Sequence, residues 1–312
     1  MKLWLWILLL PLLLVGCTPQ TEGYIDFSSG SPLEFEKNIY NDTEEKPLRI
    51  AVASVMSSNM TITSYRNVAQ YISEKINRPV VLIQRKTYDE VNLLMSSGEA
   101  DVAFMSTGGY ASYRGINKVE VLVTQEYEGV DTYYVYIVTN NDNDNDNDND
   151  THSLLDLKGK RFAYSDPLSY SGHIAIAMRI REYGYTSDTF FSHYAYTHSH
   201  DKSLQAVKDR AVDGACVDSL VYDYAKRHKP DLIDDLAVID SLGPIPSGPV
   251  VVQKSMPKET KDMLQEIFLT MHENPTVLQS MKRLLVDRFI MPRTELFEGV
   301  RTTYDRISEV SE

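Results

Sequence analysis

A repeated alternation of strand-like and helix-like segments is the feature that most constrains the fold of this chain. Leu48 to Ala53 is an apolar run of strand length, and Ser64 to Asn77 places apolar residues on one helical face. The same pairing recurs at residues 80–83 and 87–97, and again from Arg161 to Tyr183. Alternating strands and helices predict mainly parallel sheets with helices on both faces, so the expected fold class is α/β.

The alternation occurs in two successive blocks, which predicts two lobes. The chain beyond residue 46 is too long for one average domain and suits two of ordinary size. We expect lobe 1 to comprise residues 47–138 and 243–312, because the helices predicted near the C-terminus have no sheet of their own. Lobe 2 then comprises residues 139–242 and includes an Asp/Asn repeat at 140–150, which is typical of a loop. A cleft between two such lobes is the expected ligand site.

The N-terminus has the features of an export signal. Residues 1–16 hold a lysine and an apolar run of about thirteen residues, which is too short to span a bilayer core. Leu14-Val15-Gly16-Cys17 resembles a bacterial lipobox, which implies lipidation of Cys17 and a membrane-anchored, extracytoplasmic protein. Residues 17–46 read as a flexible tether. Cys216 is the other cysteine, and its apolar surroundings predict a buried thiol.

The charge of the chain excludes some classes of partner. The formal net charge is -13, and an acidic protein repels nucleic acid and acidic lipid surfaces. No basic patch with interleaved aromatic residues is present in the sequence, so nucleic-acid binding is not expected. A small anionic ligand remains compatible, because helix ends and backbone amides can bind an anion locally.

Polar residues gather at three strand-to-helix turns of lobe 2. Ser169-Tyr170-Ser171-Gly172 follows one predicted strand, His198 to Asp201 follows the next, and Asp218 ends a third. Ligands of open α/β sheets bind at the carboxyl ends of strands, and a helix start attracts anions through its unpaired N–H groups. Helix capping is the alternative role for these serine and aspartate side chains.

Lobe 1 offers weaker candidates of the same kind. Gly108-Gly109-Tyr110 follows a strand, where glycine lets backbone amides approach a ligand and Tyr110 could donate its hydroxyl. Packing beside the helix start is the alternative role of Tyr110. Ser57 and Tyr65 flank the first strand and the first helix, and could add contacts.

The order and spacing of these segments, together with Ser199 to Val207 and Ile245-Pro246-Ser247-Gly248-Pro249, resemble the phosphate/phosphite/phosphonate substrate-binding family of ABC importers. The resemblance covers essentially the whole mature chain. It implies a two-lobed type II periplasmic-binding-protein fold, an ABC permease as partner, and capture of a phosphonate or related oxyanion such as phosphite or phosphate. The chain departs from the family at Tyr170, where relatives often have threonine, and at Gly109, where proline is usual. The residues that we expect to contact the ligand are Ser57, Tyr65, Gly109, Tyr110, Ser169, Tyr170, Ser171, His200 and Asp218.

The proposed selectivity depends on Asp218. We expect its carboxylate to accept a hydrogen bond from a protonated oxygen of the ligand and to repel sulfate, which carries no proton near neutral pH. An amine on the ligand could instead pair with Asp218 or Asp201. No cofactor or metal is expected, and a monomer is the expected state.

The sequence allows three other interpretations. A hydrolase would use Ser171, His200 and Asp218, but no Gly-x-Ser-x-Gly elbow is present, so an enzyme is not expected. A metal-binding solute receptor could use His198 and His200, although one such pair has too few ligands for a closed zinc site. A ligand-sensing module for a membrane kinase is the third alternative.

Overall fold

The computed structural model describes residues 46–53, 55–141 and 151–308. All of these residues belong to one compact unit, Glu45–Glu312. The predicted export signal at 1–16, Cys17, the tether up to residue 45 and most of the Asp/Asn repeat lie outside the described residues. Among the described helices, none combines the length and the apolar character needed to cross a bilayer.

The first lobe is built on a six-stranded mixed sheet with the order β11-β4-β10-β3-β1-β2. Strands β1, β2 and β3 are parallel, whereas β10 runs antiparallel between β3 and β4, and β11 forms the far edge. The strands are β1 (Leu48–Ala53), β2 (Val80–Arg85), β3 (Val102–Phe104), β4 (Val119–Glu126), β10 (Pro249–Gln253) and β11 (Arg288–Ile290).

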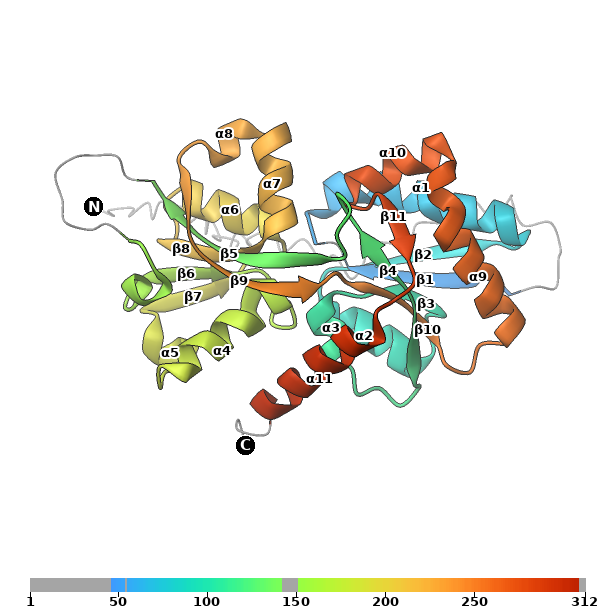
Figure 1. Cartoon of the computed structure of the whole chain (residues 1–312), viewed down its shortest axis with the longest axis horizontal. Helices are drawn as coiled ribbons and strands as arrows, with labels where there is room; N and C mark the ends of the chain where they lie inside the picture. Colours follow the sequence, from blue (N-terminus) through green and yellow to red (C-terminus); the bar gives the residue numbers. More distant parts are fainter. Residues whose placement is uncertain (1–45, 54, 142–150, 309–312) are drawn as a thin grey trace, which may run out of the picture. The chain divides into compact units, whose positions relative to one another are not determined.

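Helices cover both faces of this sheet (Figure 1). Leu48, Ile50 and Val52 of β1 face one apolar core, with α1, α9 and α10, while Ala51 and Ala53 face the other, with α2. This alternation is the period-2 pattern of a strand that is buried on both faces. The helices of this lobe are α1 (Ser58–Ile76), α2 (Tyr88–Ser97), α3 (Thr107–Ser112), α9 (Lys258–Thr270), the short 3-10 helix η4 (Met271–Glu273), α10 (Pro275–Arg283) and α11 (Thr294–Ser308).

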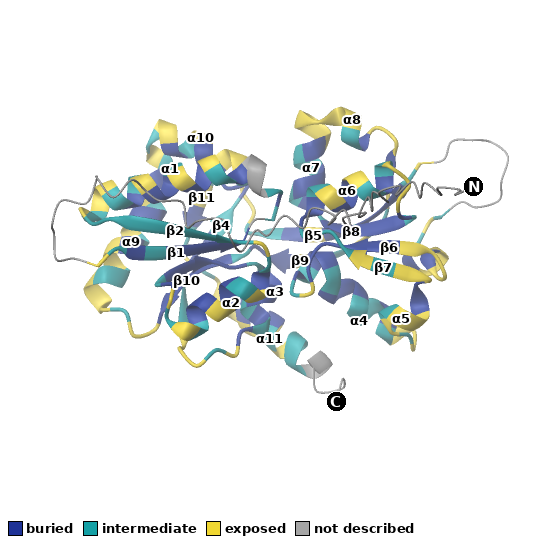
Figure 2. Ribbon diagram, turned by 180° about the vertical axis from the view of Figure 1, so that it is seen from behind, coloured by how far each residue is buried: buried dark blue, intermediate teal, exposed yellow. Residues whose placement is uncertain are grey.

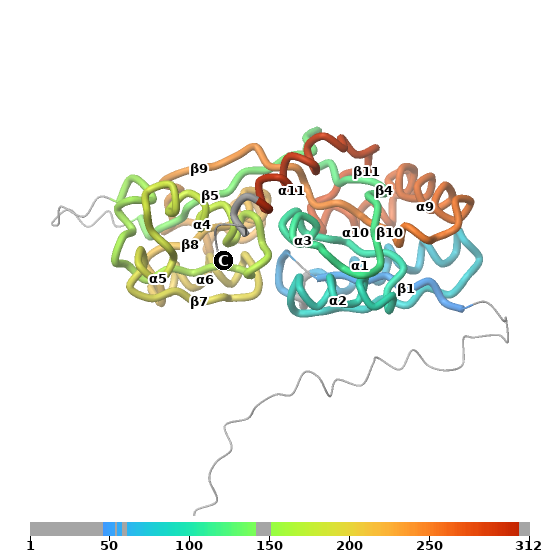
Figure 3. Tube along the Cα trace, turned by 90° about the horizontal axis from the view of Figure 1, so that it is seen from below, coloured from blue at the N-terminus to red at the C-terminus, as the bar shows by residue number. Residues whose placement is uncertain are grey.

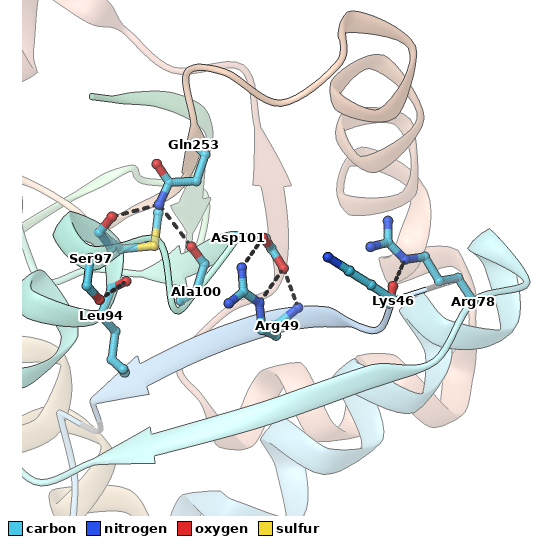
Figure 4. Close-up of polar contacts among 9 residues, drawn as sticks. Lys46, Arg49, Arg78, Leu94, Ser97, Ala100, Asp101 and Gln253 are labelled. Atoms are coloured by element: carbon cyan, nitrogen blue, oxygen red, sulfur yellow. Dashed lines mark hydrogen bonds and ion pairs between the residues drawn. The ribbon is translucent and has the colours of Figure 1, made fainter. Parts of the chain in front are cut away.

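The loops at the start of the first sheet are held by side-chain contacts. Arg49 of β1 donates backbone and guanidinium hydrogen bonds to Asp101, which precedes β3 (Figure 4). The side-chain amide of Gln253 donates to the backbone carbonyls of Met95 and Ala100, which ties β10 to the end of α2. These contacts lie at the amino ends of β1 and β3, so they leave the carboxyl ends free for a site.

The second lobe is built on a five-stranded sheet with the order β7-β6-β8-β5-β9. Strands β6, β7 and β8 are parallel, and β5 and β9 are antiparallel to their neighbours. Figure 2 shows that the central strand β8 is buried, whereas the edge strand β7 is largely exposed or intermediate. The strands are β5 (Thr132–Asn140), β6 (Arg161–Tyr164), β7 (His193–Tyr196), β8 (Gly214–Asp218) and β9 (Leu236–Pro246).

Two apolar cores again flank the sheet. Val217 of β8 packs with α6, α7 and α8, while Cys216 on the opposite face packs with α4 and α5 and is fully buried. The helices are the 3-10 helix η2 (Leu154–Leu157), the π-helical turn η3 (Tyr170–Ile174), α4 (Ala175–Glu182), α5 (Ser187–Phe190), α6 (His200–Lys208), α7 (Ser219–His228) and α8 (Pro230–Ile233). The predicted α/β class, with two sheets in a type II binding-protein arrangement, is confirmed.

The chain passes between the sheets at two places. Strands β5 and β9 run side by side and both belong wholly to the second sheet (Figure 3). The chain therefore changes sheets at residues 127–131 and 247–248, whereas the sequence placed the changes at 138/139 and 242/243, inside these two strands. The difference arises because an apolar strand pattern does not state which sheet the strand joins.

Candidate functional site

A cavity lies where the carboxyl ends of parallel strands from both sheets meet the starts of the following helices. Lobe 1 contributes the turns after β1, β2 and β3, and lobe 2 contributes the turns after β6, β7 and β8. The space open to the centre of a water molecule is about 70 Å³. That is several times the roughly 10–15 Å³ that one water needs on the same measure, so the cavity suits a compact ligand.

The serine turn after β6 forms one wall. Ser169 and Ser171 are both about 2% exposed and both line the cavity. The Ser169 hydroxyl accepts the backbone N–H of Gly172 at 3.0 Å and so caps η3. A Cβ at Gly172 would lie 1.7 Å from the Ser165 hydroxyl, so only glycine lets this turn pack against the end of β6.

His200, the first residue of α6, is 1% exposed and lines the same cavity. Its Nδ1 accepts the backbone N–H of Asp218 at 3.1 Å, so the proton of the neutral ring is on Nε2. Nε2 lies 3.4 Å from the hydroxyls of Ser165 and Ser169. Burial lowers the pKa of His200 to about 4, and the ring is therefore an uncharged donor at neutral pH.

Asp218 is the acidic residue of the cavity. It ends β8 and caps α7, because its Oδ1 accepts the backbone N–H of Leu220 at 2.8 Å. Burial raises the pKa of Asp218 to about 7, against the lowering effect of the amides of Leu220 and Val221. The carboxyl group is therefore near half protonation at neutral pH, and can share one proton with a ligand oxygen.

Three tyrosines complete the wall. Tyr65 of α1, Tyr88 of α2 and Tyr133 of β5 are each less than 9% exposed and line the cavity. Burial raises the pKa of each hydroxyl well above its ordinary value, and the Asp218 carboxylate adds to this effect at Tyr133. All three hydroxyls remain protonated in the physiological range and are available as donors.

The site attracts an anion without a basic side chain. Helices α2, α3, α6 and α7 and the turn η3 all begin at the cavity, and the start of a helix carries a partial positive charge. Among the described residues that line the cavity, Lys and Arg are absent and Asp218 is the only acidic one. The arrangement therefore favours a small anion that brings or accepts one proton.

Five of the nine residues predicted from sequence line the cavity: Tyr65, Ser169, Ser171, His200 and Asp218. Tyr110 instead packs edge-on against Phe297 with a centroid distance of 5.6 Å, and Arg301 stacks over its ring. The other three predicted residues are also absent from the cavity lining. Tyr170 packs against the apolar core on the α4 side, the Gly109 amide donates to Ser106, and the Ser57 amide donates to Asp201.

Four further residues that were not predicted from the sequence also line the cavity: Tyr88, Thr107, Tyr133 and Ser247. Tyr88 could have been found, because it comes after a strand and lies inside a Thr87-x-x-Glu90 capping box, which together mark the same kind of strand-to-helix turn. Tyr133 has no such signal, since it lies at the beginning of a strand.

Gly108 brings the two lobes into close contact beside the cavity. A Cβ at this position would lie 2.1 Å from the backbone carbonyl oxygen of Leu168 and 2.7 Å from the amide nitrogen of Tyr170. Gly108 belongs to α3 of lobe 1, whereas both neighbours belong to the serine turn of lobe 2. Any side chain at this position would hold the lobes apart.

The geometry argues against a hydrolase. In a Ser-His-Asp triad a carboxylate accepts the Nδ1 proton of the histidine, which fixes the ring as a general base. Here Nδ1 of His200 accepts a backbone N–H, and the Asp218 carboxylate accepts a different amide. Within the part of the chain that the structure describes, no three His, Cys, Asp or Glu side chains gather as metal ligands would.

Comparison with known proteins gives the family. A family model described as "ABC transporter, phosphonate, periplasmic substrate-binding protein" matches residues 50–296. The chain belongs to this family. The resemblance seen in the sequence is thus confirmed, and the protein is a periplasmic substrate-binding protein of the phosphonate ABC-transporter type, which acts outside the cytoplasm.

Individual relatives of this phosphonate-binding family agree. The phosphonates-binding periplasmic protein of Escherichia coli (strain K12) is 23% identical over 250 residues, which cover 78% of this chain and 71% of that protein. A binding protein of an ABC phosphonate transporter from Pseudomonas aeruginosa has a TM-score of 0.73 at 18% identity, covering 82% of this chain and 85% of that one. PhnD1 from Prochlorococcus marinus, solved with methylphosphonate, has a TM-score of 0.75 at 14% identity, covering 84% and 98%. The first two of these relatives are described as binding proteins, and the third was solved with a phosphonate bound.

Proposed function

We propose that the cavity binds the phosphorus oxyanion group of a small phosphonate, with phosphite and phosphate as related ligands. The observation that carries the proposal is the convergence of helix starts, hydroxyls and a neutral histidine around one carboxyl group with a pKa of about 7. Ser169, Ser171 and Nε2 of His200 would donate to the ligand oxygens. The hydroxyls of Tyr65, Tyr88 and Tyr133 are further donors.

Asp218 would select the ligand through one shared proton. In the complex, that proton lies between the carboxyl group and a phosphorus-bound oxygen, whichever partner brings it. Oxygens of phosphonates and phosphates are basic enough to hold a proton near neutral pH, with a second pKa of roughly 6 in phosphate monoesters. Sulfate could bind only to the protonated carboxyl group, and its weakly basic oxygens would accept a weaker hydrogen bond. We therefore expect sulfate to bind more weakly than a phosphonate.

The substituent on phosphorus would be small and uncharged. An ammonium group needs a carboxylate or an aromatic cage. Asp218 is the only acidic residue among the described residues of the lining, and in this proposal both its carboxyl group and the three tyrosine hydroxyls are used by the oxyanion. Asp201, the other carboxylate considered for an amine, accepts the backbone N–H of Ser57 at 2.9 Å and is not part of the lining. Apolar atoms of Val55, Met56 and Leu285 are available to a methyl-sized group.

The protein would deliver its ligand to an ABC permease as a monomeric lipoprotein. Lipidation of Cys17 is supported by the Leu14-Val15-Gly16-Cys17 sequence, and would hold the protein at the membrane. Labelling with a radioactive fatty acid in a bacterium that processes lipoproteins tests this point. Label should enter the wild type and be lost in Cys17→Ser.

Calorimetric titration of the soluble form that begins after Cys17 tests the ligand. Methylphosphonate, phosphite and phosphate should release or absorb heat with 1:1 stoichiometry, while 2-aminoethylphosphonate and sulfate should bind at least tenfold more weakly. Ser169→Ala should weaken binding by about tenfold, the effect of one lost hydrogen bond to a charged group. Ser192→Ala, at an exposed serine of the same lobe, is the matched control. A folded, ligand-free sample that binds no phosphorus oxyanion would refute the proposal.

A further inference from the structure

Two aspartates of lobe 2 hold the starts of two helices of lobe 1. Asp201, in the first turn of α6, accepts the backbone N–H of Ser57 at 2.9 Å, and Ser57 is the N-cap residue of α1. Asp166, in the turn after β6, accepts the backbone N–H of Tyr88 at 3.3 Å, and Tyr88 is the first residue of α2. The two contacts use different helices and different turns.

The chemistry of a helix start explains why these contacts stabilise the closed arrangement, in which the two lobes are in contact. The first N–H groups of a helix have no partner within the helix, and a carboxylate near them is stabilised by the helix dipole. Capping carboxylates normally belong to the chain just before their own helix. Here each carboxylate comes from the other lobe, so both bonds exist only while the lobes are together.

Neighbouring contacts fix the geometry of both bonds. The backbone N–H of His200, next to Asp201, donates to the carbonyl of Val55 at 3.1 Å. The other oxygen of Asp166 accepts the backbone N–H of Leu168 at 2.8 Å, and the Leu168 carbonyl is the group that faces Gly108. Asp166 is 4% exposed, so opening the lobes would change its surroundings. Neither aspartate is among the residues that line the cavity.

We propose that Asp166 and Asp201 are positioning residues that latch the lobes in the closed state, and that they set ligand affinity without contacting the ligand. A ligand must enter and leave through a state in which the lobes are apart, because both lobes form the wall of the cavity. A weaker latch lowers the population of the closed state, and the apparent affinity falls with that population. The factor is a property of the protein and is the same for every ligand.

Asp201→Ala is the cleaner test, because Asp166 also supports the serine turn of its own lobe. We expect Kd to rise about fivefold, the factor that corresponds to the loss of one helix-capping bond. The affinities for methylphosphonate, phosphite and phosphate should fall by the same factor within twofold. The dissociation rate should rise with little change in the association rate. Asp209→Ala, at the exposed C-terminal end of the same helix, is the matched control and should leave Kd unchanged.

A second variant removes the donor instead of the acceptor. Ser57 has φ of -54°, which proline can adopt, so Ser57→Pro deletes this N–H without a change of φ at this position. Ser57→Pro should raise Kd in the wild type and have little further effect in Asp201→Ala. Equal melting temperatures of the ligand-free variants would show that the fold is retained.

Three results of the binding experiments would overturn the latch. An unchanged Kd in Asp201→Ala would show that the bond does not stabilise closure, and a change that differs among the three anions would show direct contact with the ligand. Additive effects of Ser57→Pro and Asp201→Ala would show that the two groups are not partners.

A wild type that binds none of the anions would refute the proposed function but not the latch. The latch is then tested by measuring the distance between two dyes, one attached to Ser192→Cys in lobe 2 and the other to Ser255→Cys in lobe 1. Asp201→Ala should enlarge the population in which the lobes are apart, and an unchanged distribution of distances would overturn the latch.

Discussion

Replacement of Asp218 by asparagine should remove the pH dependence of ligand binding. The complex needs one proton between Asp218 and the ligand, and the pKa of Asp218 is raised to about 7 by burial. As the pH rises through this value, the free protein loses the proton that binding requires, so the affinity of the wild type falls. An asparagine amide donates a hydrogen bond without titrating, and it can still cap α7.

The size of the effect follows from the pKa. Between pH 7 and pH 9 the protonated fraction of a group with a pKa of about 7 falls from about one half to about one hundredth. The second pKa of a phosphorus oxyanion also lies near neutral, roughly 6 in phosphate monoesters, so the ligand brings part of the proton at pH 7 and almost none at pH 9. Kd of the wild type should therefore rise at least tenfold, which is at least ~1.4 kcal/mol at 1.4 kcal/mol per factor of ten. His200 and the three tyrosines do not titrate in this interval.

Calorimetry at constant ionic strength measures this directly. Titrations of methylphosphonate at pH 8.5 in buffers of different ionisation enthalpy should show uptake of close to one proton by the wild type and none by Asp218→Asn. The ratio of the affinities for methylphosphonate and sulfate should also be smaller in Asp218→Asn than in the wild type. A wild-type Kd that stays within threefold from pH 7 to pH 9, or a variant that keeps the steep slope, would refute the shared-proton argument.

Further predictions concern closure, protonation and stability. Gly108→Ala should weaken every ligand by tenfold or more in titrations, because its Cβ would lie 2.1 Å from the Leu168 carbonyl oxygen, whereas Gly299→Ala, with open space around it, should not. In NMR titrations His200 should stay neutral, protonated on Nε2, down to a pKa of about 4, and a midpoint near 6.5 would contradict its burial. Asp218→Asn should stabilise the ligand-free protein at pH 8 by up to ~4 kcal/mol and not at pH 4 in thermal melts. The wild type holds the Asp218 proton more tightly when folded, so it loses stability as pH rises from 3.8 to about 7.

Much of the fold was predictable because its determinants are local. The alternation of strand and helix patterns depends on residues within one or two turns of each other, and it identified both α/β units. The same holds for the serine turn and for Asp218, since a polar residue at a strand end that begins a helix is placed by its immediate neighbours. Ser169 and Ser171 of this turn and Asp218 all line the cavity.

What the tertiary structure decided depends on packing between segments far apart in the chain. Tyr110 follows a strand-to-helix turn of the kind that binds ligands, yet Phe297 and Arg301 of α11 cover its ring. No local pattern predicts that contact. Tyr133 reaches the cavity because β5 joins the second sheet, a pairing determined by β8 and β9. The raised pKa of Asp218 comes from burial, and the hydrogen bond from Ser57 to Asp201 comes from contact between the lobes. The sequence by itself determined which turns carry polar groups, because capping and periodicity are short-range. Only the folded chain decided which groups meet and how they are charged, because burial is a property of the whole packing.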